Sequence, residues 1–102
     1  MSGKLDLFKR WRDDTRRRLE NLGYSTEVFN SPQSDNLSAR LDFRGAGVQA
    51  TIACWESGNI AVEAYSDAKA QFFEHQGDAD EEKDIQGSLD KYLDRLLAWF
   101  DS

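Results

Sequence analysis

Apolar residues recur every three or four positions in two segments, one near each end of the chain. In the first segment these positions are Leu5, Phe8, Trp11, Thr15, Leu19 and Leu22. The spacing predicts an amphipathic helix over residues 4–22, and Gly23 follows it where a helix C-terminal glycine belongs. In the second segment they are Ile85, Leu89, Tyr92, Leu93, Leu96, Leu97 and Phe100. This second pattern predicts a helix over about residues 80–100.

Between the two helices the pattern changes to alternation, which is typical of half-buried strands. The clearest case is residues 37–44, where Leu37, Ala39, Leu41 and Phe43 alternate with polar residues. Further strands are predicted over residues 25–29, 48–55, 60–65 and 70–75, with turns at 30–36, 45–47, 57–59 and 66–69. In the last strand the adjacent Phe72 and Phe73 leave open which of the two faces inward.

The order of these elements predicts the fold class. No helical segment separates successive strands, so the strands pair in antiparallel fashion. We therefore predict an α+β fold in two layers, with an N-terminal helix, a meander sheet of four to five antiparallel strands and a C-terminal helix. Both helices are expected on one sheet face, which leaves the other face open. A length of 102 residues is that of a single domain, spanning residues 1–102.

Charge is distributed unevenly along the chain. Residues 1–50 carry nine Lys and Arg against seven Asp and Glu, whereas residues 51–102 carry four against twelve, within a net charge of −6. Part of this acidity has a local reason, because Asp80–Asp84 would lie in the first turn of the second helix and suit its dipole. The other acidic residues of this half would attract a basic partner. The alternative is that the acidity only keeps the protein soluble.

The residues that enzymes and metal sites depend on are scarce. His75 is the single histidine and Cys54 the single cysteine, and Cys54 is expected to pack in the core as a small hydrophobe. No glycine-rich phosphate loop opens a helix. We therefore expect no catalytic residue, no metal and no cofactor. Residues 1–10 do not resemble a signal peptide and no apolar run could span a bilayer, so we expect a cytoplasmic protein that does not bind membranes.

A basic stretch on the first helix has two interpretations. Its members are Lys9, Arg10, Arg12, Arg16, Arg17 and Arg18. They could grip phosphates, as in a nucleic-acid-binding protein. The favoured interpretation is a solvated helix face, because Asp13 and Asp14 are close enough along the helix to pair with them. We therefore expect no nucleic-acid partner.

The sheet face away from the helices is the predicted binding surface. If the alternation holds, Trp55, Glu63 and Tyr65 all lie on it, and aromatic anchors among steering charges are typical of protein interfaces. The candidate binding residues are Trp55, Glu56, Glu63, Tyr65, Asp67, Glu74 and Asp78. The alternative is that a loop covers this face, or that Trp55 only packs against a sheet edge.

Several of these features together resemble a known family. They are Phe8-x-x-Trp11, Leu19, Gly23-Tyr24, Trp55-Glu-Ser-Gly58, Glu63 and the terminal amphipathic helix. In order and spacing they resemble the TriTu family of bacterial immunity proteins. The resemblance covers most of the chain, although the Pro32 region and the Ala68–Gln71 turn match no pattern of the family.

The resemblance implies a function and a partner. Immunity proteins of this kind neutralise a cognate toxin domain in contact-dependent growth inhibition and related systems, and many such toxins are nucleases with positively charged clefts. We therefore expect a monomer that binds the C-terminal domain of a toxin. The alternative function is a small acidic chaperone or adaptor for a secreted effector. No binding residue is carried over from the family, because immunity proteins diverge at the surface that contacts the toxin.

Overall fold

The computed structural model describes residues 4–30, 38–45, 47–56, 58–69, 71–78 and 85–101, with 71–78 described by their backbone. The elements follow in the order α1 (Lys4–Asn21), β1 (Ser25–Asn30), β2 (Ser38–Gly45), β3 (Val48–Trp55), β4 (Asn59–Ser66), β5 (Gln71–Asp78) and α2 (Ile85–Asp101).

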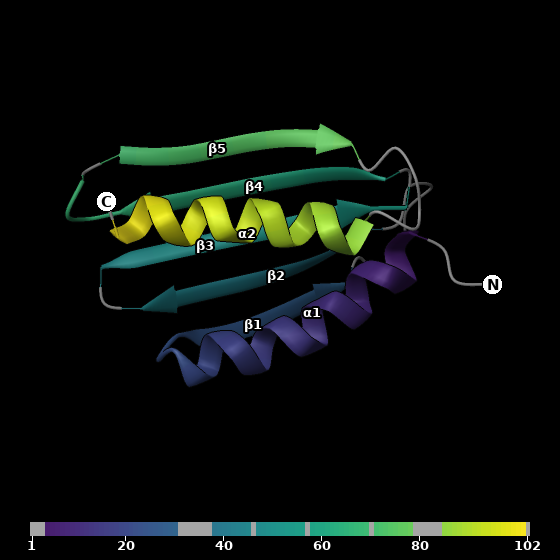
Figure 1. Cartoon of the computed structure of the whole chain (residues 1–102), viewed down its shortest axis with the longest axis horizontal. Helices are drawn as coiled ribbons and strands as arrows, with labels where there is room; N and C mark the ends of the chain where they lie inside the picture. Colours follow the sequence, from purple (N-terminus) through teal and green to yellow (C-terminus); the bar gives the residue numbers. More distant parts are fainter. Residues whose placement is uncertain are drawn as a thin grey trace.

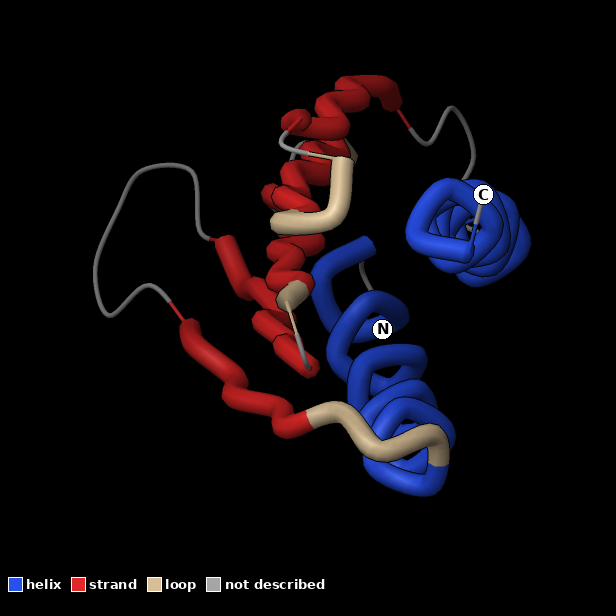
Figure 2. Tube along the Cα trace, turned by 90° about the vertical axis from the view of Figure 1, so that its left-hand side faces the viewer, coloured by secondary structure: helices blue, strands red, loops and turns tan. Residues whose placement is uncertain are grey.

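The five strands form one antiparallel sheet whose spatial order, β1-β2-β3-β4-β5, repeats the order along the chain. Figure 1 shows this meander with α2 lying across its middle strands and α1 beside β1 and β2. In the edge-on view of Figure 2, both helices lie on the same side of the sheet. The predicted α+β class, the two layers and the placement of both helices on one face are confirmed.

The last strand is longer than its sequence pattern suggested. The strand was expected over residues 70–75, but β5 continues to Asp78, with Gly77 opposite Ile60 and Asp78 opposite Asn59. Backbone pairing with the full length of β4 extends the strand past the point where its own apolar pattern stops. The start of the second helix, expected near residue 80, and the dipole role of Asp80–Asp84 fall on residues 79–84, which lie outside the described residues.

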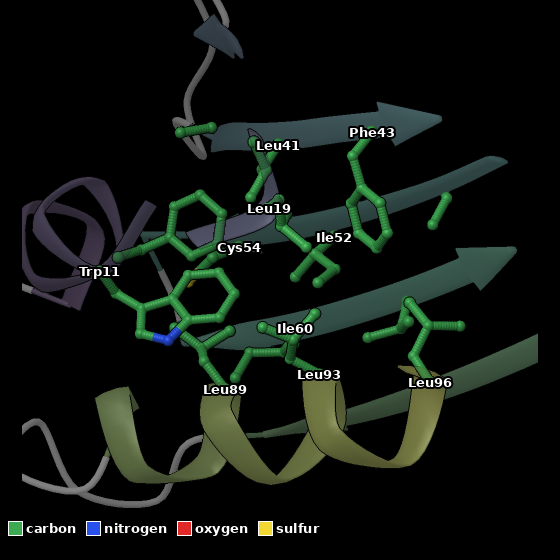
Figure 3. Packing of buried hydrophobic residues seen from close by; sticks show 14 of the residues in the cluster. Trp11, Leu19, Leu41, Phe43, Ile52, Cys54, Ile60, Leu89, Leu93 and Leu96 are labelled. Atoms are coloured by element: carbon green, nitrogen blue, oxygen red, sulfur yellow. The ribbon is translucent and has the colours of Figure 1, made fainter. Parts of the chain in front are cut away.

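The core lies between the sheet and the two helices. Leu41, Ile52 and Val62 stand opposite one another in register on β2, β3 and β4, and all three are fully buried. The helices supply the other half of the core from residues spaced three or four apart: Phe8, Trp11, Thr15 and Leu19 on α1, and Ile85, Leu89, Leu93 and Leu96 on α2. In Figure 3 the strand side chains point toward those of α2. Cys54 is buried in this layer, as expected.

A hydrogen-bonded turn ends α1 where the sequence predicted. The N–H of Tyr24 donates to the carbonyl of Leu19 (3.0 Å), and the N–H of Gly23 donates to that of Glu20 (3.0 Å). This pair of bonds is the Schellman motif, which places its C′ residue in the left-handed region. Gly23 accordingly has φ +98°. The turn directs the chain back along the sheet, so that β1 starts beside the end of α1.

Two arginines of α1, Arg12 and Arg16, depart from the solvated face that was expected of the basic stretch, whereas Arg10, Arg17 and Arg18 are exposed. Arg12 is only 6% exposed, and its Nη1 donates to the carbonyl of Phe29 (3.2 Å) and to Oδ1 of Asn30 (2.8 Å). Arg16 Nε donates to Oγ1 of Thr26 (3.1 Å). Both arginines thus find their acceptors on β1, the strand that directly follows α1 in the chain.

Arg18 connects α1 to the other helix, α2. Its Nη2 lies 3.5 Å from Oδ1 of Asp94 on α2, although both side chains are largely exposed. Trp11 Nε1 also donates to α2, at Oδ1 of Asp90 (2.7 Å). The polar side chains of α1 thus connect it both to the sheet and to α2.

Candidate protein-binding surface

No described helix or strand covers the sheet face opposite the helices. We call this surface the open face and define it by the outward side chains of four strands. They are Ser25, Glu27 and Phe29 of β1, Ser38, Arg40, Asp42 and Arg44 of β2, Gln49, Thr51, Ala53 and Trp55 of β3, and Asn59, Ala61, Glu63 and Tyr65 of β4. Because side chains alternate along each strand, the register of the sheet sets the neighbours on this face.

Three of the predicted residues lie on the open face. Trp55 and Tyr65 are half-buried and Glu63 is exposed. Glu63 pairs in register with Thr51, and Tyr65 with Gln49. Trp55 lies six residues further along β3 than Gln49, which separates the two rings by about 20 Å. The rings therefore stand at opposite ends of the open face, with Glu63 between them, and neither is sealed inside the protein.

The other predicted residues are spread over the sheet ends and β5. Glu56 is exposed and follows β3, next to Trp55. Asp67 is exposed in the turn at the opposite end of β4, where its N–H donates to the carbonyl of Gly47 (2.7 Å). On β5, Glu74 is the register partner of Glu63 and Asp78 that of Asn59. The seven residues thus do not form one compact cluster.

The open face also contains charged residues that sequence reasoning missed. Arg44 Nη2 lies 3.0 Å from Oε1 of Glu27, and Arg40 Nε lies 3.4 Å from Oδ1 of Asp42. Thr51 Oγ1 donates to the same Asp42 oxygen (2.8 Å). The signal was present in the sequence, because the outward positions of the clearest strand are alternately basic and acidic. The face is therefore a mixed, largely paired surface and not a uniformly negative one.

Glu63 is the exception to this pairing. Within the part of the chain that the structure describes, no hydrogen bond or ion pair reaches its carboxylate. Phe29, which sequence reasoning also missed, is 40% exposed and carries the Arg40 guanidinium over its ring at 4.2 Å. The unpaired charge of the described open face is thus negative and belongs to one residue.

Two shallow hollows indent the open face. One, of about 340 Å³, has a mostly polar rim that includes Glu27, Arg44, Gln49 and Tyr65. The other, of about 410 Å³, lies over the small side chains of Ala53 and Ala61, and its wall includes Phe29, Arg40, Trp55 and Glu63. Among the described residues, no group of three or more His, Cys, Asp or Glu side chains is placed to hold a metal ion. The chemistry that the face offers is stacking, apolar contact and ion pairing.

The described elements define a small two-layer α+β protein with one sheet face left open for contact. The chain matches the family model of the immunity protein TriTu over residues 6–95, and it belongs to this family of immunity proteins. The resemblance inferred from its motifs is thereby confirmed. Comparisons with curated proteins and with solved structures found no significant match. Neither described helix is both long and apolar enough to cross a membrane.

Proposed function

We propose that this protein neutralises a toxin domain of contact-dependent growth inhibition by binding it with the open face. The toxin is a basic protein of the nuclease type, and the contact takes place in the cytoplasm. Membership of an immunity protein family supports the neutralising role. The net charge of −6 supports a basic partner, because opposite fields accelerate encounter.

One observation carries the assignment of the surface. On a sheet face that no described element covers, the half-buried ring of Trp55 lines the same hollow as an exposed carboxylate, Glu63, that has no partner among the described residues. Tryptophan anchors contribute a large share of binding energy at protein interfaces, and rim charges steer association. A surface that only had to be solvated would gain nothing from holding this ring outward.

The contacts of α1 support a protein partner over a nucleic acid. Arg12, Arg16 and Arg18, which could have gripped phosphates, are engaged by Asn30, Thr26 and Asp94. We propose that the protein acts as a monomer without catalytic activity. A chaperone for an unfolded client has less support, because the exposed large hydrophobics of the described chain are only Leu22 and Phe29, and Arg40 stacks on Phe29.

Co-expression with the toxin domain encoded in the adjacent upstream reading frame tests the proposal. Cells that produce the toxin domain alone should stop growing, and cells that also produce this protein should recover. The Trp55→Ala variant should bind the toxin more weakly while its melting temperature stays near that of the wild type, because the ring lies outside the core. Continued growth arrest in the presence of abundant folded protein would reject the function.

A further inference from the structure

The hollow over Ala53 and Ala61 has a shape that follows from the register of the sheet. Phe29, Arg40, Ala53 and Ala61 stand in one row across β1 to β4. The row begins with two large side chains and continues with two methyl groups. Because β3 and β4 run antiparallel, Trp55, two residues further along β3, and Glu63, two residues further along β4, flank this row on opposite sides. A floor of small side chains is thus enclosed by larger ones, in a volume of about 410 Å³.

The charge in this hollow is negative. Arg40 contributes a positive charge to the wall, but Asp42 lies 3.4 Å from its Nε and offsets it. The Arg40 guanidinium also covers the Phe29 ring at 4.2 Å, so that ring face is already occupied. No ion pair with a described residue offsets the charge of Glu63 in this way. An occupant of the hollow therefore meets one uncompensated carboxylate.

We propose that this hollow receives a single arginine side chain of the toxin, an inference that rests on the proposed function. The methylene stem of the arginine packs on Ala53 and Ala61. Its guanidinium reaches Glu63, where planar donors match a carboxylate, while the Trp55 ring, on the opposite side of the alanine floor, packs against the stem. An acidic side chain would be repelled by Glu63, and a purely apolar one would bury that carboxylate without a partner. The net charge of −6 favours the same occupant.

Filling the hollow tests its shape. The probe is the catalytically inactivated toxin domain from the adjacent reading frame, and the readout is Kd by calorimetry. Ala53→Leu should raise Kd about tenfold or more, the loss typical of a disturbed interface anchor. Ala98→Leu makes the same change on an exposed part of α2 and should leave Kd within about twofold. Both variants should keep the wild-type melting temperature, because both side chains point away from the core.

Neutralising Glu63 tests the charge. Glu63→Gln keeps the shape of the side chain and should also raise Kd about tenfold. Glu20→Gln, at an exposed position on α1, is the matched control and should leave Kd unchanged. Alanine substitution of the arginines of the toxin, one at a time, should then identify one arginine whose loss is not additive with Ala53→Leu. That coupling is the positive result.

Four results would overturn the inference, and they are distinguishable. If the wild type forms no complex, the proposed function fails and this inference fails with it. If the wild type binds but Ala53→Leu and Glu63→Gln bind equally well, only the hollow is wrong. If Arg40→Gln weakens binding while Glu63→Gln does not, the occupant is acidic. If sedimentation shows a dimer that Ala53→Leu dissociates, the occupant is a second copy of this chain.

Discussion

Arg12 is a charged residue at a buried position, where a charge is energetically unfavourable. Its side chain lies between α1 and the end of β1, where Nη1 has two acceptors and Nε has no partner within the described chain. Burial lowers the pKa of its guanidinium, an effect larger than the opposing influence of Asp13. Since arginine remains protonated at any ordinary pH, the residue contributes by satisfying the carbonyl of Phe29 and the side chain of Asn30.

Removing this guanidinium should destabilise the protein without affecting the open face directly. We expect Arg12→Ala to lower the free energy of unfolding by about 2 kcal/mol, because the charged hydrogen bonds to Phe29 and Asn30 are lost together with the packing of the buried side chain. Urea denaturation measures the change. Arg17→Ala, on the exposed side of the same helix, should change stability by less than about 0.5 kcal/mol. Equal effects of the two substitutions would contradict the structural role of Arg12.

Tyr24 should make stability depend on pH in the alkaline range. Burial raises the pKa of its phenol above the ordinary 10.0, and the charge of Asp101 adds to the shift. The ring packs edge-on against Phe43, with centroids 5.2 Å apart. Because the folded state holds this proton more tightly, the unfolded state loses it first as the pH rises past about 10. The contribution of Tyr24 to stability is therefore complete below pH 10 and declines above it.

Melting temperatures between pH 8 and 11 test this expectation. The wild type should lose stability more steeply above about pH 10 than the Tyr24→Phe variant, which has no phenol to titrate. The comparison isolates Tyr24 from the lysines and the other tyrosines, since the two proteins share all of them. Parallel curves for the two proteins would show that the environment of Tyr24 does not disfavour its anion.

At the scale of elements, two glycines with equal space around them should respond in opposite ways to the same substitution. A Cβ added at Gly23 or at Gly87 would meet no atom within 4 Å. Gly23, however, has φ +98° in the turn that ends α1, whereas Gly87 lies within α2. Gly23→Ala should destabilise the protein by about 1–2 kcal/mol. Gly87→Ala should stabilise it by about 0.5–1 kcal/mol.

Thermal or urea unfolding of the two variants checks this pair of predictions. Because neither methyl group creates a clash, the difference in sign reports backbone conformation alone. Destabilisation by both substitutions would mean that α2 tolerates a side chain at position 87 no better than the turn does at position 23.

The elements that could be predicted from the sequence are those whose pattern comes from burial. The helix expected over residues 4–22 ends within one residue of α1, because Leu19 and Gly23 mark both the buried face and the turn. Strand β2, expected over 37–44, is found at Ser38–Gly45. The end of β5 could not be predicted, because Gly77 and Asp78 belong to the strand through the hydrogen bonds of β4 and not through their own side chains.

At the scale of the whole molecule, pairing between strands decides which charges meet. Trp55, Glu63 and Tyr65 could be placed on the open face from alternation alone. Arg40 and Arg44 pair there with Asp42 and Glu27, which lie like them in the basic half of the sequence, so the paired charges of this face do not come from the acidic half. The structure therefore places these three residues on the face expected for them, while the charges of that face are more evenly balanced than the acidic half of the sequence suggested.

Long-range charge should appear in the kinetics of binding to the toxin domain. If the net charge of −6 steers a basic partner, the association rate constant should fall about tenfold when the salt concentration rises from roughly 0.05 to 0.5 M. The dissociation rate constant should change much less. Stopped-flow fluorescence measures both rates. Trp55→Ala should speed dissociation but keep the salt dependence of association, and a salt-independent association rate would exclude steering.

The burial of Cys54 has a practical consequence for all of these measurements. This residue is the only cysteine in the chain and its side chain has no exposed surface, so thiol reagents should leave the native protein unmodified. A cysteine introduced at Ala98, or elsewhere on the outer surface, would then accept a fluorescent dye at one known position. Labelling of Cys54 itself would occur only in molecules that have opened, which makes the natural thiol a built-in reporter of unfolding.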